Sequence, residues 1–558
     1  MPNAIINMNS VNKLLESSFK NNWERPAISN YKGATITYGQ LSYNIVATHI
    51  MFEKCGIKPG DKIAICSKNQ ANWGVAFLAS LTYGAVPVPI LNEFKSGTIH
   101  HLVNHSNSRL LYVGEAIWEN LSPAEMPDVE AIAQMENFSV LYAKDKTLKE
   151  DRLNIDAIMN ERYGDSFGPD SLSFYEDSPE ELALINYTSG TSGFSKGVMI
   201  PYRALYSNIK FGSYAMPSLN NQSRVVSMLP TAHMYGLMFE FLFEMTIGAC
   251  TYFLTRLPSP RILMEAFSEI KPSVIISVPM IIEKIYKNKL IPIISKKRIK
   301  MFLNLPGLDK VVKKRIKDEL ISAFGGQFEQ VIIGGAAFNR EAEVFFKRIK
   351  FPFTVGYGMT ECAPIITYVP HNKTKLYSCG VAAPGMQIRI DSPDPARVPG
   401  EILVKGDNVF LGYYRNEEAT NAVFTKDGWF KTGDIGVLGS RGYLYLKGRN
   451  KSMILGPSGQ NIYPEEIESG INNLPYVAES LVVDENGQLV ALVYPDFDLM
   501  EKEGLSQDEV LERIKDGINI VNMELPVFCQ VKNVELIPEE FEKTPKRSIK
   551  RYLYQRNN

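Results

Sequence analysis

The feature that most constrains the fold is a run of hydroxyl residues and glycines between two apolar stretches, residues 185–201, INYTSGTSGFSKGVMIP. An apolar run on each side of a Gly-rich polar segment predicts a strand, a loop and a second strand. Glycines allow several backbone N–H groups to point to one centre, and these groups, the hydroxyls and Lys196 together suit phosphate oxygens. The Walker nucleotide-binding pattern is absent, because Ser195 replaces its second glycine and Gly197 follows the lysine. A Ser/Gly loop without a ligand is the alternative; the flanking apolar runs and the single lysine favour the phosphate site.

Composition narrows the class of protein. The chain has 558 residues, 45% of them apolar and 22% charged, which is typical of a globular protein with several domains. A net charge of −1 gives no global indication of nucleic-acid binding. The six cysteines include no C-x-x-C pair, so we expect free thiols in a reducing compartment and no zinc site. No basic region followed by an apolar run opens the chain, so no signal peptide is expected and a cytoplasmic location is predicted.

Alternating strand and helix patterns predict an α/β fold. Within residues 62–114, apolar runs of strand length alternate with helical patterns, which predicts β-α-β units and a largely parallel sheet. His100, His101 and His105 lie on one predicted helix without a carboxylate or cysteine among them, so a solvated helix face is favoured over a metal site. Short strands with Gly- and Pro-rich turns then predict a small β-barrel at about residues 377–440.

Residues 187–197, YTSGTSGFSKG, resemble the phosphate loop of the adenylate-forming superfamily, which includes acyl-CoA synthetases, peptide-synthetase adenylation domains and luciferases. Other stretches resemble the family's motifs in the same order along the chain, among them LPTAHMYG at 229–236, GGA at 334–336, YGMTE at 357–361 and TGD at 432–434. Within the superfamily, the chain is most similar to the long-chain fatty acid–CoA ligases.

The resemblance implies a domain organisation. An adenylating N-terminal domain, residues 1–448, would contain two α/β lobes with parallel-type sheets together with the small barrel. A hinge at residues 449–452 would join it to a small, mobile α+β lid domain, residues 453–558.

The resemblance also implies roles for individual residues. Phosphates would be bound by one set of residues, namely Thr188, Ser189, Gly190, Thr191, Ser192, Gly193 and Lys196. Adenine would lie against a second set, namely Gly334, Gly335, Ala336, Tyr357 and Gly358. Thr360 would hold a phosphate oxygen, Glu361 would bind Mg²⁺, and Asp434 with Arg449 would bind the ribose; His233 and Gly236 would line the acid site. Charge supports the metal assignment without the family, because a triphosphate needs a hard cation and such a cation prefers carboxylate oxygens.

The final motif departs from the family. Its members usually end in P-K-T-x-x-G-K, whose last lysine contacts the carboxylate and the α-phosphate, whereas this chain has EKTPKRSIKR at 542–551 with Ser548 at the lysine position. Lys546 or Lys550 is expected to act as the catalytic lysine instead, because a flexible ammonium can reach a site from a neighbouring position. A basic tail without a catalytic role is the alternative.

One segment carries a strong local charge. Twelve basic residues and one acid, Asp309, occur between Lys284 and Lys317, interleaved with apolar residues. A solvated helical face is the default interpretation, and a basic amphipathic surface that contacts the inner face of an anionic membrane is the alternative. A similar insertion occurs in the long-chain branch that the chain resembles.

The resemblance therefore predicts an enzyme, an AMP-forming acid–thiol ligase that uses ATP, Mg²⁺ and coenzyme A to convert a fatty acid, expected to be long-chain, into its acyl-CoA. Two alternatives are an acyl-AMP ligase that loads an acyl carrier protein and a non-catalytic protein that binds a nucleotide or an acyl lipid. The sequence predicts neither the exact chain length of the acid nor the oligomeric state.

Overall fold

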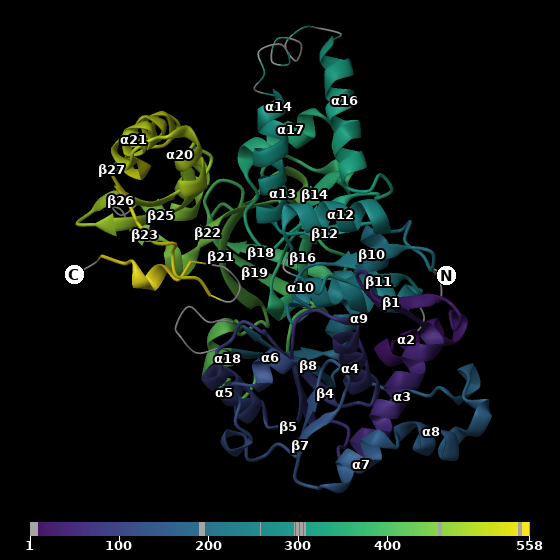
Figure 1. Ribbon diagram of the computed structural model, residues 1–558. Coiled ribbons are helices and arrows are strands. Elements are labelled where there is room, and N and C mark those ends of the chain that lie inside the picture. The colour runs from purple at the N-terminus through teal and green to yellow at the C-terminus, as the bar shows by residue number, and fades with distance from the viewer. Residues whose placement is uncertain are drawn as a thin grey trace.

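The computed structural model describes residues 9–188, 196–256, 258–294, 308–455, 460–544 and 549–556, with the single residues 296, 299, 301 and 305. Figure 1 shows three groups of elements: the N-terminal α/β part below, a second α/β part above it, and the C-terminal residues to one side. The predicted α/β class is confirmed, since helices alternate with largely parallel sheets in both N-terminal parts.

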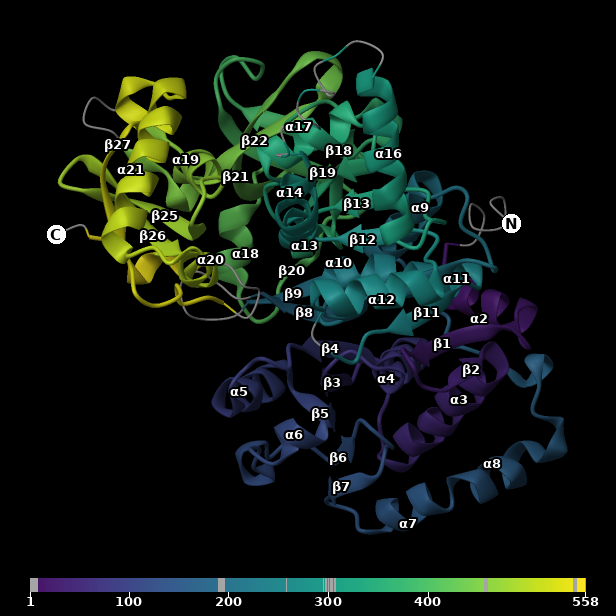
Figure 2. The same cartoon turned by 45° about the horizontal axis from the view of Figure 1, so that its top comes forward.

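The first α/β part is a five-stranded sheet of order β4-β3-β5-β6-β7, parallel except for the last pair. Its strands are β3 (Lys62–Cys66), β4 (Val86–Ile90), β5 (Ser108–Val113), β6 (Ala131–Gln134) and β7 (Val140–Ala143). Helices α5 (Ser96–Ser106) and α6 (Glu115–Trp118) cover one face, and α3 (Tyr38–Lys54), α4 (Ala71–Thr82), α7 (Thr147–Leu153) and α8 (Ile155–Tyr163) lie on the other (Figure 2). Pro87 and Pro89 place β4 at the sheet edge, because proline cannot donate to a second neighbour.

The helix that carries His100, His101 and His105 differs in part from the prediction of a solvated face. The helix α5 is confirmed, but His100 is buried, with 7% of its surface exposed, and its Nε2 accepts a hydrogen bond from the Ser122 amide at 3.1 Å. The later turn that contains Ser122 packs over His100. Sequence periodicity within a helix does not predict such a contact with another segment. The prediction of a solvated face was therefore wrong for His100, whereas His101 is exposed.

The second α/β part contains two sheets and the predicted strand–loop–strand hairpin. One sheet has the order β10-β11-β1-β2, with β1 (Pro26–Asn30), β2 (Thr35–Thr37), β10 (Arg224–Ser227) and β11 (Cys250–Phe253). The other is parallel, with β12 (Ile275–Ser277), β13 (Val331–Ile333) and β14 (Phe353–Val355). The hairpin pairs β8 (Leu182–Thr188) with β9 (Lys196–Pro201), and β20 (Gly412–Tyr413) adds to β9. The main helices are α2 (Val11–Asn21), α9 (Tyr202–Ala215), α11 (Phe243–Ile247), α12 (Pro260–Ile270), α13 (Pro279–Ile285), α16 (Leu308–Ala323) and α17 (Arg340–Arg348).

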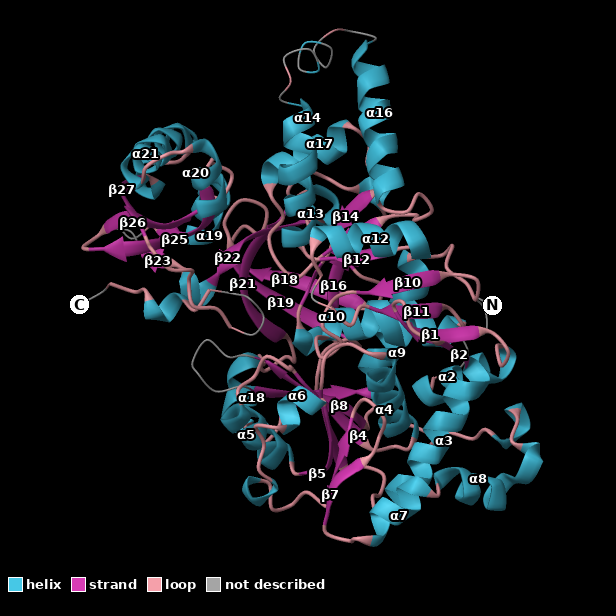
Figure 3. Ribbon diagram, in the orientation of Figure 1, coloured by secondary structure: helices cyan, strands magenta, loops and turns pink. Residues whose placement is uncertain are grey.

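The region predicted as a barrel is antiparallel and rich in turns (Figure 3). Its main sheet has the order β18-β19-β21-β22, from β18 (Met386–Asp391), β19 (Gly400–Gly406), β21 (Phe430–Leu438) and β22 (Leu444–Arg449). The residues that precede this sheet in the chain form a three-stranded sheet of β15 (Tyr357–Gly358), β16 (Ile365–Tyr368) and β17 (Val381–Ala382). The strands are confirmed; closure into a barrel is not, because β18 and β22 are edge strands of the sheet.

The C-terminal residues have apolar cores of their own, drawn from residues 454–554. Here β25 (Val477–Glu485), β26 (Gln488–Pro495) and β27 (Val531–Leu536) form one sheet with α19 (Pro464–Ile471), α20 (Phe497–Glu503) and α21 (Gln507–Glu524). Separate cores agree with a separate domain, and the boundary at 449–452 stays a prediction.

The basic segment 284–317 is mostly helical where the structure describes it. The first turns of α16 project from the molecule (Figure 1), whereas its later residues Ile316 and Leu320 are buried. Among the described residues, none of the helices combines the length and apolar composition that crossing a bilayer requires.

Candidate active site

The hairpin of β8 and β9 flanks the predicted phosphate loop, and its two end residues lie opposite each other. Thr188 and Lys196 pair across β8 and β9, and the Thr188 hydroxyl donates to the Lys196 carbonyl at 3.5 Å. Ser189, Gly190, Thr191, Ser192 and Gly193 lie outside the described residues. The Lys196 ammonium lies 4.5 Å from the ring centroid of Tyr413, which desolvates one side of the charge and leaves it available to a ligand.

The same tyrosine connects Lys196 to the predicted metal ligand. The Tyr413 hydroxyl donates to Glu361 Oε1 at 3.0 Å, and the Phe410 amide donates to the Glu361 carbonyl at 2.9 Å. Burial and the neighbouring Glu361 carboxylate raise the pKa of Tyr413, so this phenol remains a donor. One oxygen of a buried carboxylate is thereby oriented, and the lysine lies over the face of the same ring.

A second contact chain surrounds Asp434. The Tyr357 hydroxyl donates to Asp434 Oδ2 at 2.6 Å, and Arg449 Nε lies 3.2 Å from Asp434 Oδ1, as the pairing of β21 with β22 requires. Burial raises the pKa of Asp434, and the Arg449 guanidinium opposes that rise. Asp434 is 8% exposed whereas the Arg449 side chain is 67% exposed, so a buried carboxylate lies beside a guanidinium that faces solvent.

The predicted adenine loops meet at the carboxyl ends of adjacent parallel strands. The Gly356 amide donates to the Ile333 carbonyl at 2.9 Å, and the Gly334 amide donates to the Ser277 carbonyl at 3.1 Å. Ligands in open α/β sheets gather at such an edge. Gly358 is required there because a Cβ would lie 2.2 Å from the Pro364 carbonyl oxygen, and Gly335 has φ +90°, a conformation that favours glycine.

The predicted acid-site turn lies next to these loops. His233 precedes a short helix, α10 (Met234–Leu237), and its amide donates to the Pro230 carbonyl at 2.9 Å. Gly236 is buried, and a Cβ there would lie 3.0 Å from the Leu229 Cβ. The intervening Tyr235 reaches the adenine loops, because its ring lies 3.2 Å from the Cβ position of Gly334.

Three polar side chains that were not predicted hold this turn. Glu240, on a π-helical turn (Met238–Leu242), accepts from the Met228 and Leu229 amides through one oxygen, at 3.0 and 2.9 Å. Asn186 of β8 donates to the Ala232 carbonyl at 2.8 Å, and Asn69 donates to the Leu229 carbonyl at 2.6 Å. Glu240 is fully buried, and burial raises its pKa well above the ordinary value.

Replacing Glu240 therefore tests how much the turn matters. Glu240→Leu leaves two buried amides unpaired, at a cost of about 1–3 kcal/mol each, and is expected to lower the unfolding temperature and raise the KM for the acid. Glu240→Gln retains a carbonyl acceptor and should restore the KM. Steady-state kinetics on both variants make the measurement, and an unchanged KM in a folded Glu240→Leu protein would contradict a positioning role.

The residues fit a magnesium ion that the nucleotide helps to hold. Within the described part of the chain no group of three or more His, Cys, Asp or Glu side chains could hold a metal. Mg²⁺ commonly takes one or two carboxylates and completes its shell with phosphates and water. Glu361 supplies one such carboxylate, with Oε1 oriented by Tyr413.

The C-terminal lysines are not brought to these groups by described contacts. Lys550 Nζ pairs with Glu542 Oε2 at 3.0 Å, and Lys546 and Ser548 lie outside the described residues. Tyr413, which lies between Lys196 and Glu361, was missed because its segment offers no periodic or motif signal.

Comparisons with known proteins identify the family and the fold. The chain matches the AMP-binding enzyme family over residues 15–414 and the AMP-binding enzyme C-terminal domain over residues 451–557. It is 26% identical to a long-chain-fatty-acid–CoA ligase, FadD15, of Mycobacterium bovis, covering 92% of this chain and 90% of that protein. It is also 27% identical to a probable 4-coumarate–CoA ligase of Dictyostelium discoideum, covering 86% of this chain and 84% of that one. Its fold is similar to ATP-bound MatB from Rhodopseudomonas palustris, with a TM-score of 0.76, 22% identity and 98% of both chains covered. The chain therefore belongs to the AMP-binding enzyme family, the adenylate-forming superfamily that its motifs resemble.

Proposed function

We propose that the protein is an AMP-forming acid–thiol ligase that activates a fatty acid as its acyl-adenylate and transfers the acyl group to coenzyme A. The observation that carries the proposal is the pair of contact chains that meet in residues 357–361. Tyr357 leads to Asp434 and Arg449, while Glu361 leads through Tyr413 to Lys196. A ribose site and a phosphate site at the two ends of one short segment suit a nucleoside triphosphate.

In the first step the acid's carboxylate attacks the α-phosphate of ATP, and pyrophosphate leaves. Two anions must approach each other, so catalysis consists mainly of charge cancellation and in-line positioning. Lys196, Thr188 and Thr191 would neutralise and orient the phosphate oxygens, with Thr360 beside them. Bound at Glu361, Mg²⁺ would supply a hard positive charge to the phosphates.

A C-terminal lysine would complete the charge cancellation. Lys546 or Lys550 is proposed for this role because Ser548 occupies the usual lysine position. Lys550 must exchange its pairing with Glu542 for the substrate, which an exposed ion pair permits at small cost. ATP–pyrophosphate exchange by Lys546→Ala and Lys550→Ala identifies the residue, and normal exchange in both would reject the substitution.

In the second step the C-terminal domain would rotate about residues 449–452 so that the thiol of coenzyme A displaces AMP. Polar contacts hold the present arrangement. Among them, Lys287 Nζ donates to the Asn472 carbonyl at 2.9 Å, and Glu466 pairs with Arg340 at 3.4 Å and with Lys447 at 3.0 Å. Contacts of this kind are readily exchanged, and rotation would keep water away from a hydrolysable adenylate.

A long-chain acid is the proposed substrate, supported by the similarity to the long-chain-fatty-acid–CoA ligase of Mycobacterium bovis and by the basic segment. Exposed apolar side chains, Leu308 at 48% and Val311 at 65%, adjoin lysines of α16, as expected for a surface that contacts an anionic membrane. Long-chain acids partition into membranes, so such contact would bring the enzyme to its substrate.

Two assays test the proposal. Acid-dependent ATP–pyrophosphate exchange is expected and separates an enzyme from a non-catalytic binding protein. Thioester formation with free coenzyme A across acids of different chain length is expected to exceed acyl transfer to a carrier protein. Exchange without thioester formation would favour the carrier-protein ligase, and absence of exchange with every acid would reject the proposed function.

A further inference from the structure

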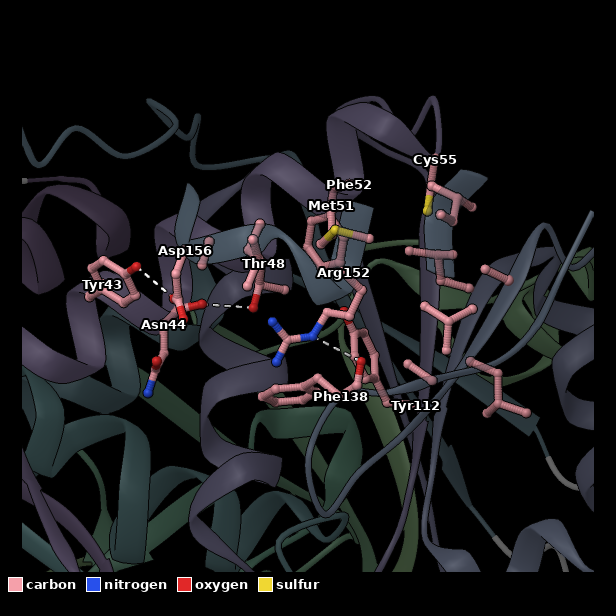
Figure 4. A pocket seen from close by; sticks show the side chains of 18 residues that line it. Tyr43, Asn44, Thr48, Met51, Phe52, Cys55, Tyr112, Phe138, Arg152 and Asp156 are labelled. Atoms are coloured by element: carbon pink, nitrogen blue, oxygen red, sulfur yellow. Dashed lines mark hydrogen bonds between the residues drawn. The ribbon is translucent and has the colours of Figure 1, made fainter. Parts of the chain in front are cut away.

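A cavity of about 170 Å³ lies in the N-terminal α/β part, outside the candidate active site. It is enclosed by α3, by strands β5, β6 and β7, and by α7 and α8 (Figure 4). Its floor is apolar and buried, formed mainly by Met51, Phe52, Leu110, Ala131 and Leu148. A dry apolar cavity of roughly 150 Å³ is large enough to hold benzene, so this one accommodates a ring or a short acyl chain.

Two side chains in the cavity wall can donate hydrogen bonds that they do not make within the described chain. Tyr112 is 6% exposed, and its hydroxyl makes no hydrogen bond to any part of the chain that the structure describes. Arg152 donates through Nε to the Phe138 carbonyl and through Nη2 to the Asn137 carbonyl, both at 3.1 Å, which leaves Nη1 free to donate. Figure 4 shows this guanidinium pointing between Thr48 and Phe138. Both groups can therefore donate to an acceptor atom of a ligand bound in the cavity.

Two other hydroxyl groups at the mouth are already paired. Tyr43 donates to Asp156 Oδ1 at 2.8 Å, and the Thr48 hydroxyl donates to the Asn44 carbonyl at 2.7 Å. The Asp156 carboxylate is exposed and weakens the attraction of the mouth for an anion, so a dissociation constant near the millimolar range is expected.

We propose that this cavity is a second, non-catalytic binding site for a small carboxylic acid with an apolar body of about six carbons. The apolar body occupies the floor, and the carboxylate accepts hydrogen bonds from Tyr112 and from Nη1 of Arg152. A bidentate or charge-assisted contact with a guanidinium is the strongest interaction that such a wall offers to a carboxylate.

Benzoate is the probe, with toluene as the same ring without the charge. Binding is measured by calorimetry on the full chain, with the active site saturated by a non-hydrolysable acyl-adenylate analogue. Wild-type protein is expected to bind benzoate at a residual site. Tyr112→Phe and Arg152→Gln should weaken benzoate binding at least tenfold and leave toluene binding unchanged, whereas Ala131→Leu fills the floor and should abolish both.

Tyr142→Phe is the matched control, because Tyr142 lies on β7 but does not line the cavity. An unfolding temperature close to that of the wild type shows that each variant is folded, and Tyr112→Phe and Arg152→Gln decide the matter if Ala131→Leu does not fold. No residual benzoate binding in the wild type, or equal binding in these two variants, would overturn the proposal. The comparison between variants is independent of the proposed activity, because none of the altered residues lies in the active site.

Discussion

Replacing Lys196 with methionine is expected to slow adenylate formation by about 10²–10³-fold, the usual cost of removing one preorganised charge from a transition state. Methionine keeps the length and much of the packing against Tyr413 but removes the ammonium that lies 4.5 Å from that ring. Because the charge is needed most as negative charge develops on the transferred phosphate, kcat should fall more than the KM for ATP rises. Acid-dependent ATP–pyrophosphate exchange measures both quantities.

Lys210 provides a matched control for this variant. Its ammonium lies 4.7 Å from the centroid of the Tyr206 ring, so it has the same cation–π geometry, but it is exposed on α9. Lys210→Met is expected to leave exchange within about twofold of wild type, since surface substitutions usually have small effects. Equal exchange rates for the two variants would mean that Lys196 does not act at the phosphate site.

The sequence was sufficient for the features that depend on local patterns. The hairpin ends, Thr188 and Lys196, follow from apolar runs around a Gly-rich segment, and the strands at residues 62–114 follow from their alternation with helices. Each of these signals lies within a few residues of the feature that it predicts.

The remaining features depend on contacts between distant segments. Tyr413 contacts both Lys196 and Glu361 only because β20 pairs with β9, and strand pairing over more than two hundred residues leaves no local pattern. Glu240 lies in an apolar helical stretch and is recognisable as a clamp only once the amides of Met228 and Leu229 are placed. Closure of a sheet into a barrel likewise depends on edge pairing that turn composition does not specify.

Glu244, one helical turn beyond Glu240, is a second carboxyl group in the core. It is fully buried, and neither of its carboxylate oxygens has a hydrogen-bond partner within the described chain. Burial raises the pKa of Glu244 to about 8. Glu240, also buried and with a raised pKa, adds no positive charge that could stabilise the ionised form.

Glu244→Gln is therefore expected to remove a pH dependence of stability. Between the ordinary pKa of 4.5 and about 8 the folded carboxyl holds a proton that the unfolded chain has lost, so the free energy of unfolding falls as pH rises through this window. The slope is about 1.4 kcal/mol per pH unit, so the advantage of the variant over wild type should grow by about 2–3 kcal/mol from pH 5.5 to 7.5. Urea unfolding followed by tryptophan fluorescence at both pH values measures this difference. The exposed Glu341→Gln on α17 is the control and should show no such growth. A constant difference for Glu244→Gln would mean that the carboxyl is already ionised in the folded protein, and that burial without a partner does not govern its charge.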